Sequence, residues 1–136
     1  FFELLQSIKG FGITSSIQLL GEIVSMPEGL THKQWVAFAG LDPRQFQSGT
    51  SVNKKVGISK AGNRRMRKAL FLPAMTAIQH DKQVKAYYNH LLENRNLAKL
   101  QAIVAVMRKL LHAIHGMFAN LKPFDSTKFY AGPLSG

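Results

Sequence analysis

Apolar residues recur at helical spacing along most of the chain, and the longest such pattern lies towards its C-terminal end. Between positions 97 and 118 the large apolar residues that follow this spacing are Leu97, Leu100, Ile103, Val104, Met107, Leu110, Leu111, Ile114 and Phe118. Spacings of three and four residues place them along one side of a helix, which predicts a long helix that packs in the core. Two earlier helices are indicated. One contains Met66, Leu70 and Ile78 and is expected to kink at Pro73, and the other follows Asp81, a suitable N-cap residue.

The N-terminal segment predicts two helices joined by a tight turn. Leu5 and Ile8 precede the turn, and Ile13 and Ile17 follow it. Gly10 and Gly12 permit positive φ in the turn, and Thr14 or Ser15 offers an N-cap for the second helix. Segment 1–25 thus has the sequence form of a helix-hairpin-helix, in which backbone N–H groups at Gly10 and Gly12 cradle a phosphate beside Lys9. A simple turn between two helices is the alternative.

The periodic pattern stops in the middle of the chain. Thr31 is a suitable cap for a short helix that contains Trp35 and ends at Gly40, and from about 41 to 61 Pro, Gly, Ser, Thr and Asn are frequent. This composition predicts an irregular loop, with a short β-hairpin around 52–58 as an option. We therefore expect a compact, mainly α domain over 1–122, helical again from 62, and a flexible tail over 123–136.

The charge of the chain predicts a polyanionic partner. The chain has 18 Lys and Arg against 7 Asp and Glu, a net charge of +11. No acidic residue lies between Asp42 and Asp81, whereas that interval holds Arg44, Lys54, Lys55, Lys60, Arg64, Arg65, Arg67 and Lys68. A surface that meets only solvent usually mixes both signs, so these cations are predicted to contact nucleic-acid phosphates. A solvated helix face is the alternative.

The residues available for chemistry are few. The chain has no Cys, so a protein nucleophile must be a hydroxyl, and Ser48 beside Gly49 in the cationic loop is the candidate. Taken alone, a serine in such a loop is more often a turn former. The acidic residues are scattered and His112 and His115 lack a third ligand, so no metal site is predicted.

The sequence also predicts where in the cell the protein is located. We find no uninterrupted apolar run of about 18 residues and no signal segment, so no membrane partner is expected. The chain begins at Phe1 without Met, as expected for an intracellular, cytoplasmic domain cut from a longer protein.

Several sequence blocks in fixed order resemble a known family. The blocks are Ile8 to Ile13, Phe38 to Arg44, Gln47 to Thr50, Gly57 to Arg65 and Val106 to Leu111. Together they resemble the C-terminal, serine-bearing transposase domain of the bridge-RNA-guided recombinases (insertion sequence one-hundred-and-ten family), which pair it with a RuvC-like DEDD domain. Pro73 and the turn at 94–97 depart from the family pattern.

This resemblance implies a function for Ser48 and a set of partners. Ser48 would be the nucleophile that forms a phosphoserine link to DNA, and the DEDD domain, from the same or another protomer, would supply Mg²⁺. This fragment would hold no cofactor and would be inactive alone. DNA, a bridge RNA and further copies in a homo-oligomer are the implied partners, in the cytoplasm of a bacterium or archaeon. The alternatives are a non-catalytic helix-hairpin-helix module that binds DNA and a structural RNA-binding protein.

Overall fold

The computed structural model describes residues 1–41 and 60–132, and these residues are mainly helical, as the sequence predicts. The helices are α1 (Phe2–Gln6), α2 (Ile13–Val24), α3 (His32–Phe38), α5 (Lys60–His80), α6 (Lys82–Glu93), α7 (Lys99–Asn120) and α8 (Ser126–Phe129). No strand occurs within these two ranges. The expected β-hairpin around 52–58 lies outside the described residues.

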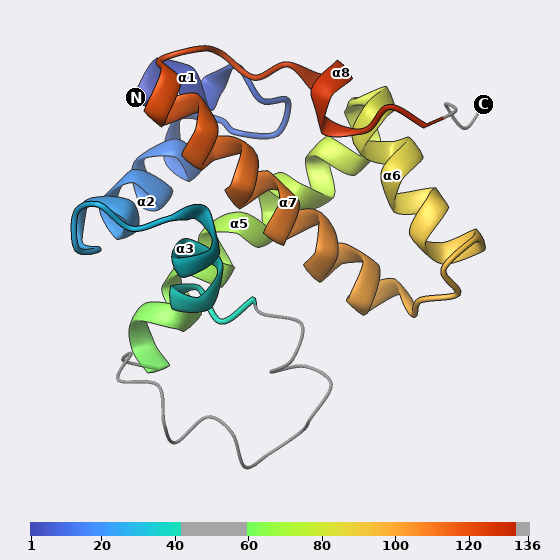
Figure 1. Ribbon diagram of the computed structural model, residues 1–136, viewed down its shortest axis with the longest axis horizontal. Coiled ribbons are helices and arrows are strands. Elements are labelled where there is room, and N and C mark those ends of the chain that lie inside the picture. Colours follow the sequence, from blue (N-terminus) through green and yellow to red (C-terminus); the bar gives the residue numbers. More distant parts are fainter. Residues whose placement is uncertain (42–59, 133–136) are drawn as a thin grey trace.

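Helix α7 is the centre of the bundle. It contacts α3, α5, α6 and α1, while α2 packs on α5, and Figure 1 shows α7 crossing α5. Leu110, Leu111 and Ile114 on α7 are fully buried, which confirms the apolar stripe predicted from the sequence. Leu100 is the exception, since it is 64% exposed.

Two predicted helix starts are confirmed and one is wrong. Thr31 caps α3 through a capping box with Gln34, and the Asp81 carboxylate accepts hydrogen bonds from the Gln83 and Val84 N–H groups at the start of α6. Helix α2, by contrast, is capped by Gly12 and not by Thr14 or Ser15, and no side chain caps it. Its first turn therefore keeps its backbone N–H groups open.

Helix α5 is continuous from Lys60 to His80 and contains Pro73, which is buried. The turn before α2 packs directly on it. Gly10 has φ +114°, and a Cβ at this position would lie 2.5 Å from the Pro73 carbonyl oxygen. Gly10 is therefore needed both for its backbone conformation and for the close approach of the turn to α5. Gly12, with φ −81°, needs no such freedom.

Part of the segment expected to be a flexible tail packs on the bundle. Helix α8 contacts α6, and Phe129 is buried in the core. The proposed domain boundaries themselves stay a prediction. Helix α7 is long and apolar enough on average to cross a membrane, although the sequence lacks an uninterrupted apolar run. Its buried stripe at the centre of the bundle identifies it as a core helix.

Candidate nucleic-acid interface

The cationic interval is structurally described from the first turn of α5 onward. Arg64, Arg65 and Lys68 are exposed, and Met66 between them is buried. The helix therefore turns its arginines outwards while Met66 and Leu70 anchor it to the core. Lys60 is the first residue of α5, but its side chain lies outside the description. Among the described residues no ion pair engages Arg64 or Arg65, so their exposed guanidinium groups can contact a phosphate.

Arg67 has a different position from its neighbours. It is half-buried, and its Nη1 donates to the Ala39 carbonyl oxygen at 3.4 Å. Burial lowers the pKa of Arg67, and the charge of Arg64 lowers it further, although a guanidinium remains protonated at neutral pH. One of its five N–H donors is thus used to hold the chain after α3, which leaves others for a phosphate.

A second arginine, Arg108 on α7, holds the same stretch of chain. Its Nη1 donates to the Leu41 carbonyl oxygen at 3.0 Å. Arg67 and Arg108 therefore fix the backbone at Ala39 and Leu41 from two different helices, directly before residue 42. This role of Arg108 cannot be inferred from the sequence, because nothing in the local pattern of α7 points to a residue that is 67 positions away.

The remaining loop residues of the predicted site lie outside the described residues. These are Arg44, Ser48, Lys54 and Lys55. The described chain ends at Leu41 and resumes at Lys60. Their assignment as nucleophile and phosphate contacts therefore stays a prediction.

In the predicted phosphate cradle near the N-terminus, the start of α2 is accessible, whereas the Lys9 amine lies near the end of α5. A Cβ at Gly12 would meet nothing within 4 Å, so the start of α2 is accessible. Ile13 and Ile17, which follow the turn in the sequence pattern, are 64% and 58% exposed. The Lys9 amine is 3.5 Å from the His80 carbonyl oxygen at the end of α5. An accessible helix start without a side-chain cap is the geometry that a backbone phosphate contact requires.

The fold also brings together histidines from two distant helices. His32 Nδ1 on α3 lies 3.3 Å from His112 Nε2 on α7, and the rings of His32 and His115 are 6.0 Å apart. His115 Nε2 donates to the Leu30 carbonyl oxygen at 2.9 Å. Within the described ranges, no group of three His, Cys, Asp or Glu side chains is arranged to hold a metal ion.

These observations define a cationic helical domain with exposed arginines at one end of α5, and comparison with known proteins assigns it to a family. Residues 2–89 match the model of the Transposase IS116/IS110/IS902 family. The chain belongs to this family.

Individual relatives agree with this assignment. The chain is 33% identical to the pilin gene-inverting protein of Moraxella bovis over 123 residues, which cover 90% of this chain and 38% of that protein. It is 32% identical to the transposase for insertion sequence element IS1111A of Coxiella burnetii over 111 residues, 77% of this chain and 29% of that protein. The chain thus spans little more than a third of these relatives at most.

Proposed function

We propose that this chain is the DNA-contacting, serine-bearing domain of a transposase or DNA recombinase. The observation that carries the proposal is the acid-free cationic interval, because its described part presents Arg64 and Arg65 to solvent on the turns that follow segment 42–59. Membership of a transposase family supports DNA as the partner. The family blocks around Ser48 support that residue as the nucleophile.

The proposed step is a transesterification at a DNA phosphodiester. The Ser48 oxygen forms a bond to phosphorus, the bond from phosphorus to one deoxyribose oxygen breaks, the hydroxyl loses its proton and the leaving oxygen gains one. The bond energy is retained in the phosphoserine link, so the strand can be rejoined by the reverse attack of a DNA hydroxyl. Arginines near the phosphate would offset the negative charge that develops on its oxygens.

The tether at Ala39 and Leu41 supports a positioning role for Arg67 and Arg108. A nucleophile must be held close to its target, since small displacements reduce the rate strongly. Arg67 and Arg108 hold the backbone before residue 42 from α5 and α7. In the proposed function they set the direction in which the serine-bearing segment leaves the bundle.

The residues described here do not fit a Mg²⁺ site. Two-metal chemistry needs clustered carboxylates, whereas the acids in the described ranges are dispersed and no metal-holding group forms. We therefore assign no step of this chain's chemistry to a metal. In the proposed assembly Mg²⁺ belongs to a DEDD domain of the same or another protomer, a bridge RNA selects the DNA, and the cytoplasm is the site of action.

The experiment that tests this proposal uses the intact recombinase with its guide RNA and DNA. Ser48→Ala should abolish the covalent protein–DNA adduct, because alanine has no oxygen to attack phosphorus, while binding of DNA is retained. The adduct is measured by denaturing gel electrophoresis with labelled DNA. Ser59→Ala is the matched control, since it removes a hydroxyl from the same interval and should leave the adduct intact.

A specific observation also favours a second candidate, a non-catalytic helix-hairpin-helix module. The first turn of α2 is open at Gly12 and no side chain caps it, as a backbone phosphate contact requires. The Ser48 experiment separates the two functions. Full recombination by Ser48→Ala would contradict the serine mechanism and favour the binding module.

A further inference from the structure

A row of polar and cationic side chains follows the outer side of α7, opposite the stripe that the helix buries. Arg108, His112, His115 and Asn120 are exposed or half-exposed, whereas Leu111, Ile114 and Met117 between them are buried. Their spacing agrees with one face of a helix. The helix from Arg108 to Asn120 is about 18 Å long at 1.5 Å per residue. The row is thus an elongated polar surface along the central helix.

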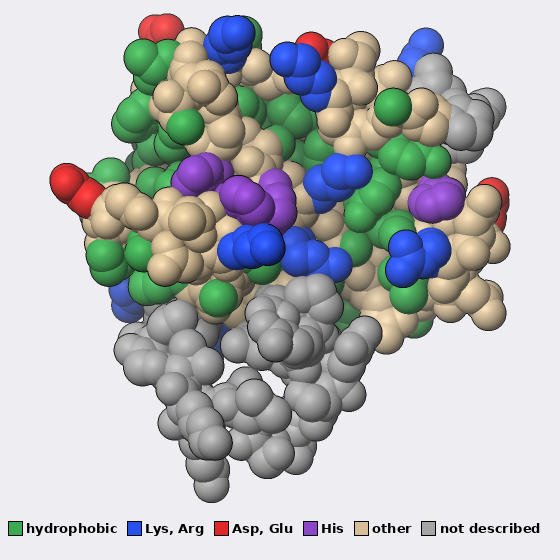
Figure 2. All heavy atoms as spheres, in the orientation of Figure 1, with side chains coloured by type: hydrophobic (Ala, Val, Ile, Leu, Met, Phe, Trp, Pro, Cys, Tyr) green, Lys and Arg blue, Asp and Glu red, His purple; other side chains and the backbone are tan. Residues whose placement is uncertain are grey.

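Helix α3 widens this row with a histidine and a lysine. His32 lies against His112, and Lys33 and Arg108 are close enough for their charges to affect His112. Figure 2 shows His side chains gathered in the middle of this face with Lys and Arg around them, while the acidic side chains lie near its margins. The surface therefore has a single sign of charge wherever His is protonated.

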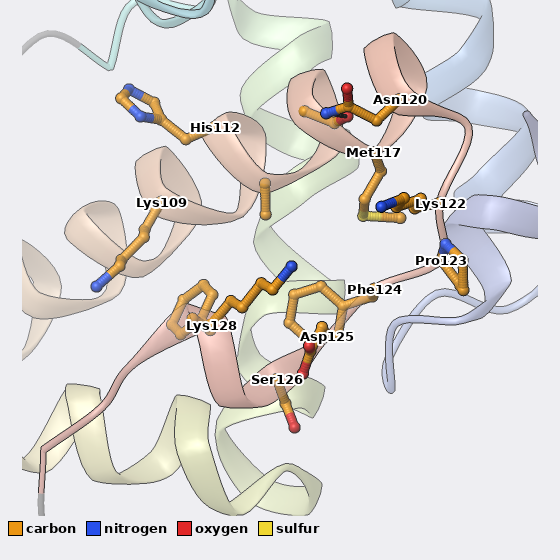
Figure 3. A pocket seen from close by; sticks show the side chains of 13 residues that line it. Lys109, His112, Met117, Asn120, Lys122, Pro123, Phe124, Asp125, Ser126 and Lys128 are labelled. Atoms are coloured by element: carbon orange, nitrogen blue, oxygen red, sulfur yellow. Dashed lines mark hydrogen bonds between the residues drawn. The ribbon is translucent and has the colours of Figure 1, made fainter.

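At its C-terminal end the row opens into a pocket of about 770 Å³, between the second half of α7 and residues 122–129. Lys109, Lys122 and Lys128 line it, and of the described residues only Asp125 adds an acidic group to the lining. Figure 3 shows Lys128 and Phe124 directed into the space below α7. The pocket thus combines cationic groups with an aromatic wall.

The charged side chains of this pocket differ in the interactions that they make with the rest of the protein. Asp125 Oδ1 accepts hydrogen bonds from Thr127 N and Thr127 Oγ1 at 3.0 and 2.6 Å, which cap α8. These hydrogen bonds, and then the charge of Lys128, lower the pKa of Asp125, so the carboxylate keeps its negative charge. The Lys109 amine lies 4.1 Å from the centre of the Tyr87 ring, which gives it a cation–π partner. Lys122 and Lys128, both exposed, form no ion pair within the described residues, although Lys128 is close enough to Asp125 for its charge to lower the pKa of that carboxyl. With Lys109 they outnumber Asp125, so the pocket keeps a net positive charge that attracts an anion.

We propose that this row and pocket form a binding track for the phosphate backbone of a single-stranded nucleic acid. A track of about 18 Å can contact several successive phosphates of one strand. Phe124 offers a ring on which a base can stack. A duplex keeps its bases inside the stack and cannot insert one into the pocket. The track uses none of the α5 arginines and does not require Ser48, so it goes beyond the proposed function.

The histidines make binding to this track depend on pH. The charged and titratable groups around His112 are basic except for Asp125: they are His32 and Lys33 from α3, Arg108, Lys109 and His115 from α7, and Lys122, Asp125 and Lys128 across the pocket. Burial lowers the pKa of His112, and the neighbouring positive charges lower it further, so free His112 is mostly neutral at neutral pH. A bound phosphate favours the protonated form. Binding thus takes up a proton, and affinity rises as pH falls.

The test measures fluorescence anisotropy of labelled oligodeoxythymidylate and oligouridylate of about 12 nucleotides with the 136-residue chain. Lys122→Ala with Lys128→Ala should weaken both strands about tenfold and flatten the slope of log K against log salt by about 1.4, since each single-strand phosphate contributes about 0.7. Lys85→Ala with Lys99→Ala is the control, because it removes two exposed lysines that lie outside the track.

Three outcomes would overturn the track. They are an unchanged slope in the Lys122 and Lys128 variant, an equal loss in the control variant, and displacement of the strand by an equal concentration of duplex. A further arm replaces His32 and His112 by Gln, which should remove the gain in affinity between about pH 7.5 and about pH 5.5. Retention of the full gain would overturn the role of the histidines.

An Arg64→Ala and Arg65→Ala variant should still bind the single strands, which separates this test from that of the proposed function. Preference for one of the two strands identifies DNA or RNA as the source of the backbone.

Discussion

Helices α5 and α7 have nearly the same length, 21 and 22 residues, and serve the molecule in different ways. Helix α7 buries a continuous apolar stripe along most of its length and contacts four other helices. Helix α5 also reaches the core, through Met66, Leu70 and Ala77, but starts with a cluster of cations and exposes Leu72 to 68%. One helix organises the core, whereas the other connects the core to a charged surface.

The difference shows that neighbouring charges of the same kind can have different structural roles. Arg64 and Arg65 are exposed, while Arg67 donates to the backbone at Ala39 and is partly desolvated. At about 100° per residue, Arg65 and Arg67 lie on different sides of the helix, whereas Arg64 is three residues before Arg67 and close enough for its charge to lower the pKa of Arg67. A charge run is therefore not uniform, and each of its members has to be tested on its own.

The largest expected effect concerns the buried stripe of α7. Leu110→Ala should lower the free energy of unfolding by about 2–5 kcal/mol, because Leu110 is fully buried and its truncation leaves a cavity. Leu100→Ala on the same helix, at a 64% exposed side chain, should change it by less than about 0.5 kcal/mol. Urea unfolding followed by circular dichroism measures both. Equal losses would contradict the assignment of the buried face.

The next effect concerns the contact of the N-terminal turn with α5. Gly10→Ala should destabilise the chain by about 1–3 kcal/mol, because φ is +114° and the new Cβ would meet the Pro73 carbonyl oxygen. Gly21→Ala in α2 should instead stabilise it by up to about 1 kcal/mol, since that position is helical and open. Thermal unfolding compares the two. A harmless Gly10→Ala would mean that the turn does not pack on α5 as described.

A smaller effect is expected from the exposed arginines of α5. Arg64→Ala with Arg65→Ala should weaken duplex DNA about tenfold and flatten the salt slope by about 1.8, at about 0.9 for each phosphate contact. Lys85→Ala with Lys99→Ala again removes two exposed charges elsewhere. Salt titrations by fluorescence anisotropy measure the slope. An unchanged slope would remove Arg64 and Arg65 from the DNA surface.

The smallest of these effects concerns the cap that separates α5 from α6. Asp81→Ala should cost about 1 kcal/mol, because the carboxylate accepts the Gln83 and Val84 N–H groups at 2.9 and 3.2 Å. Asp81→Asn keeps an acceptor oxygen and should cost less. Denaturant unfolding of the two variants distinguishes them. A similar loss in both would attribute the effect to the charge of Asp81 and not to its cap.

Much of the fold could be predicted because its causes are local. The apolar repeat of α7, the Thr31 capping box and the Asp81 cap each depend on residues within one or two helical turns. The start of α2 was assigned wrongly because Thr14 and Ser15 are good caps by type, while Gly12 occupies the cap position. Propensity alone does not choose among nearby candidates.

The candidate site was predictable only in part. The acid-free interval can be seen in the sequence, and the family blocks point to Ser48. The roles of Arg108 and His32 could not be inferred, since Leu41 and His112, with which they interact, are 67 and 80 positions away. Contacts of this range arise from the packing of α3 and α7 and leave no periodic signal.

The sequence by itself determined that the chain is helical, cationic and related to a transposase family, because helix periodicity, charge and ordered blocks are properties of the chain alone. Only the tertiary structure decided which cations are exposed, which ones donate hydrogen bonds to the backbone before residue 42, and which histidine side chains contact each other. Those properties depend on how α3, α5 and α7 pack together, and packing joins residues that the sequence keeps far apart.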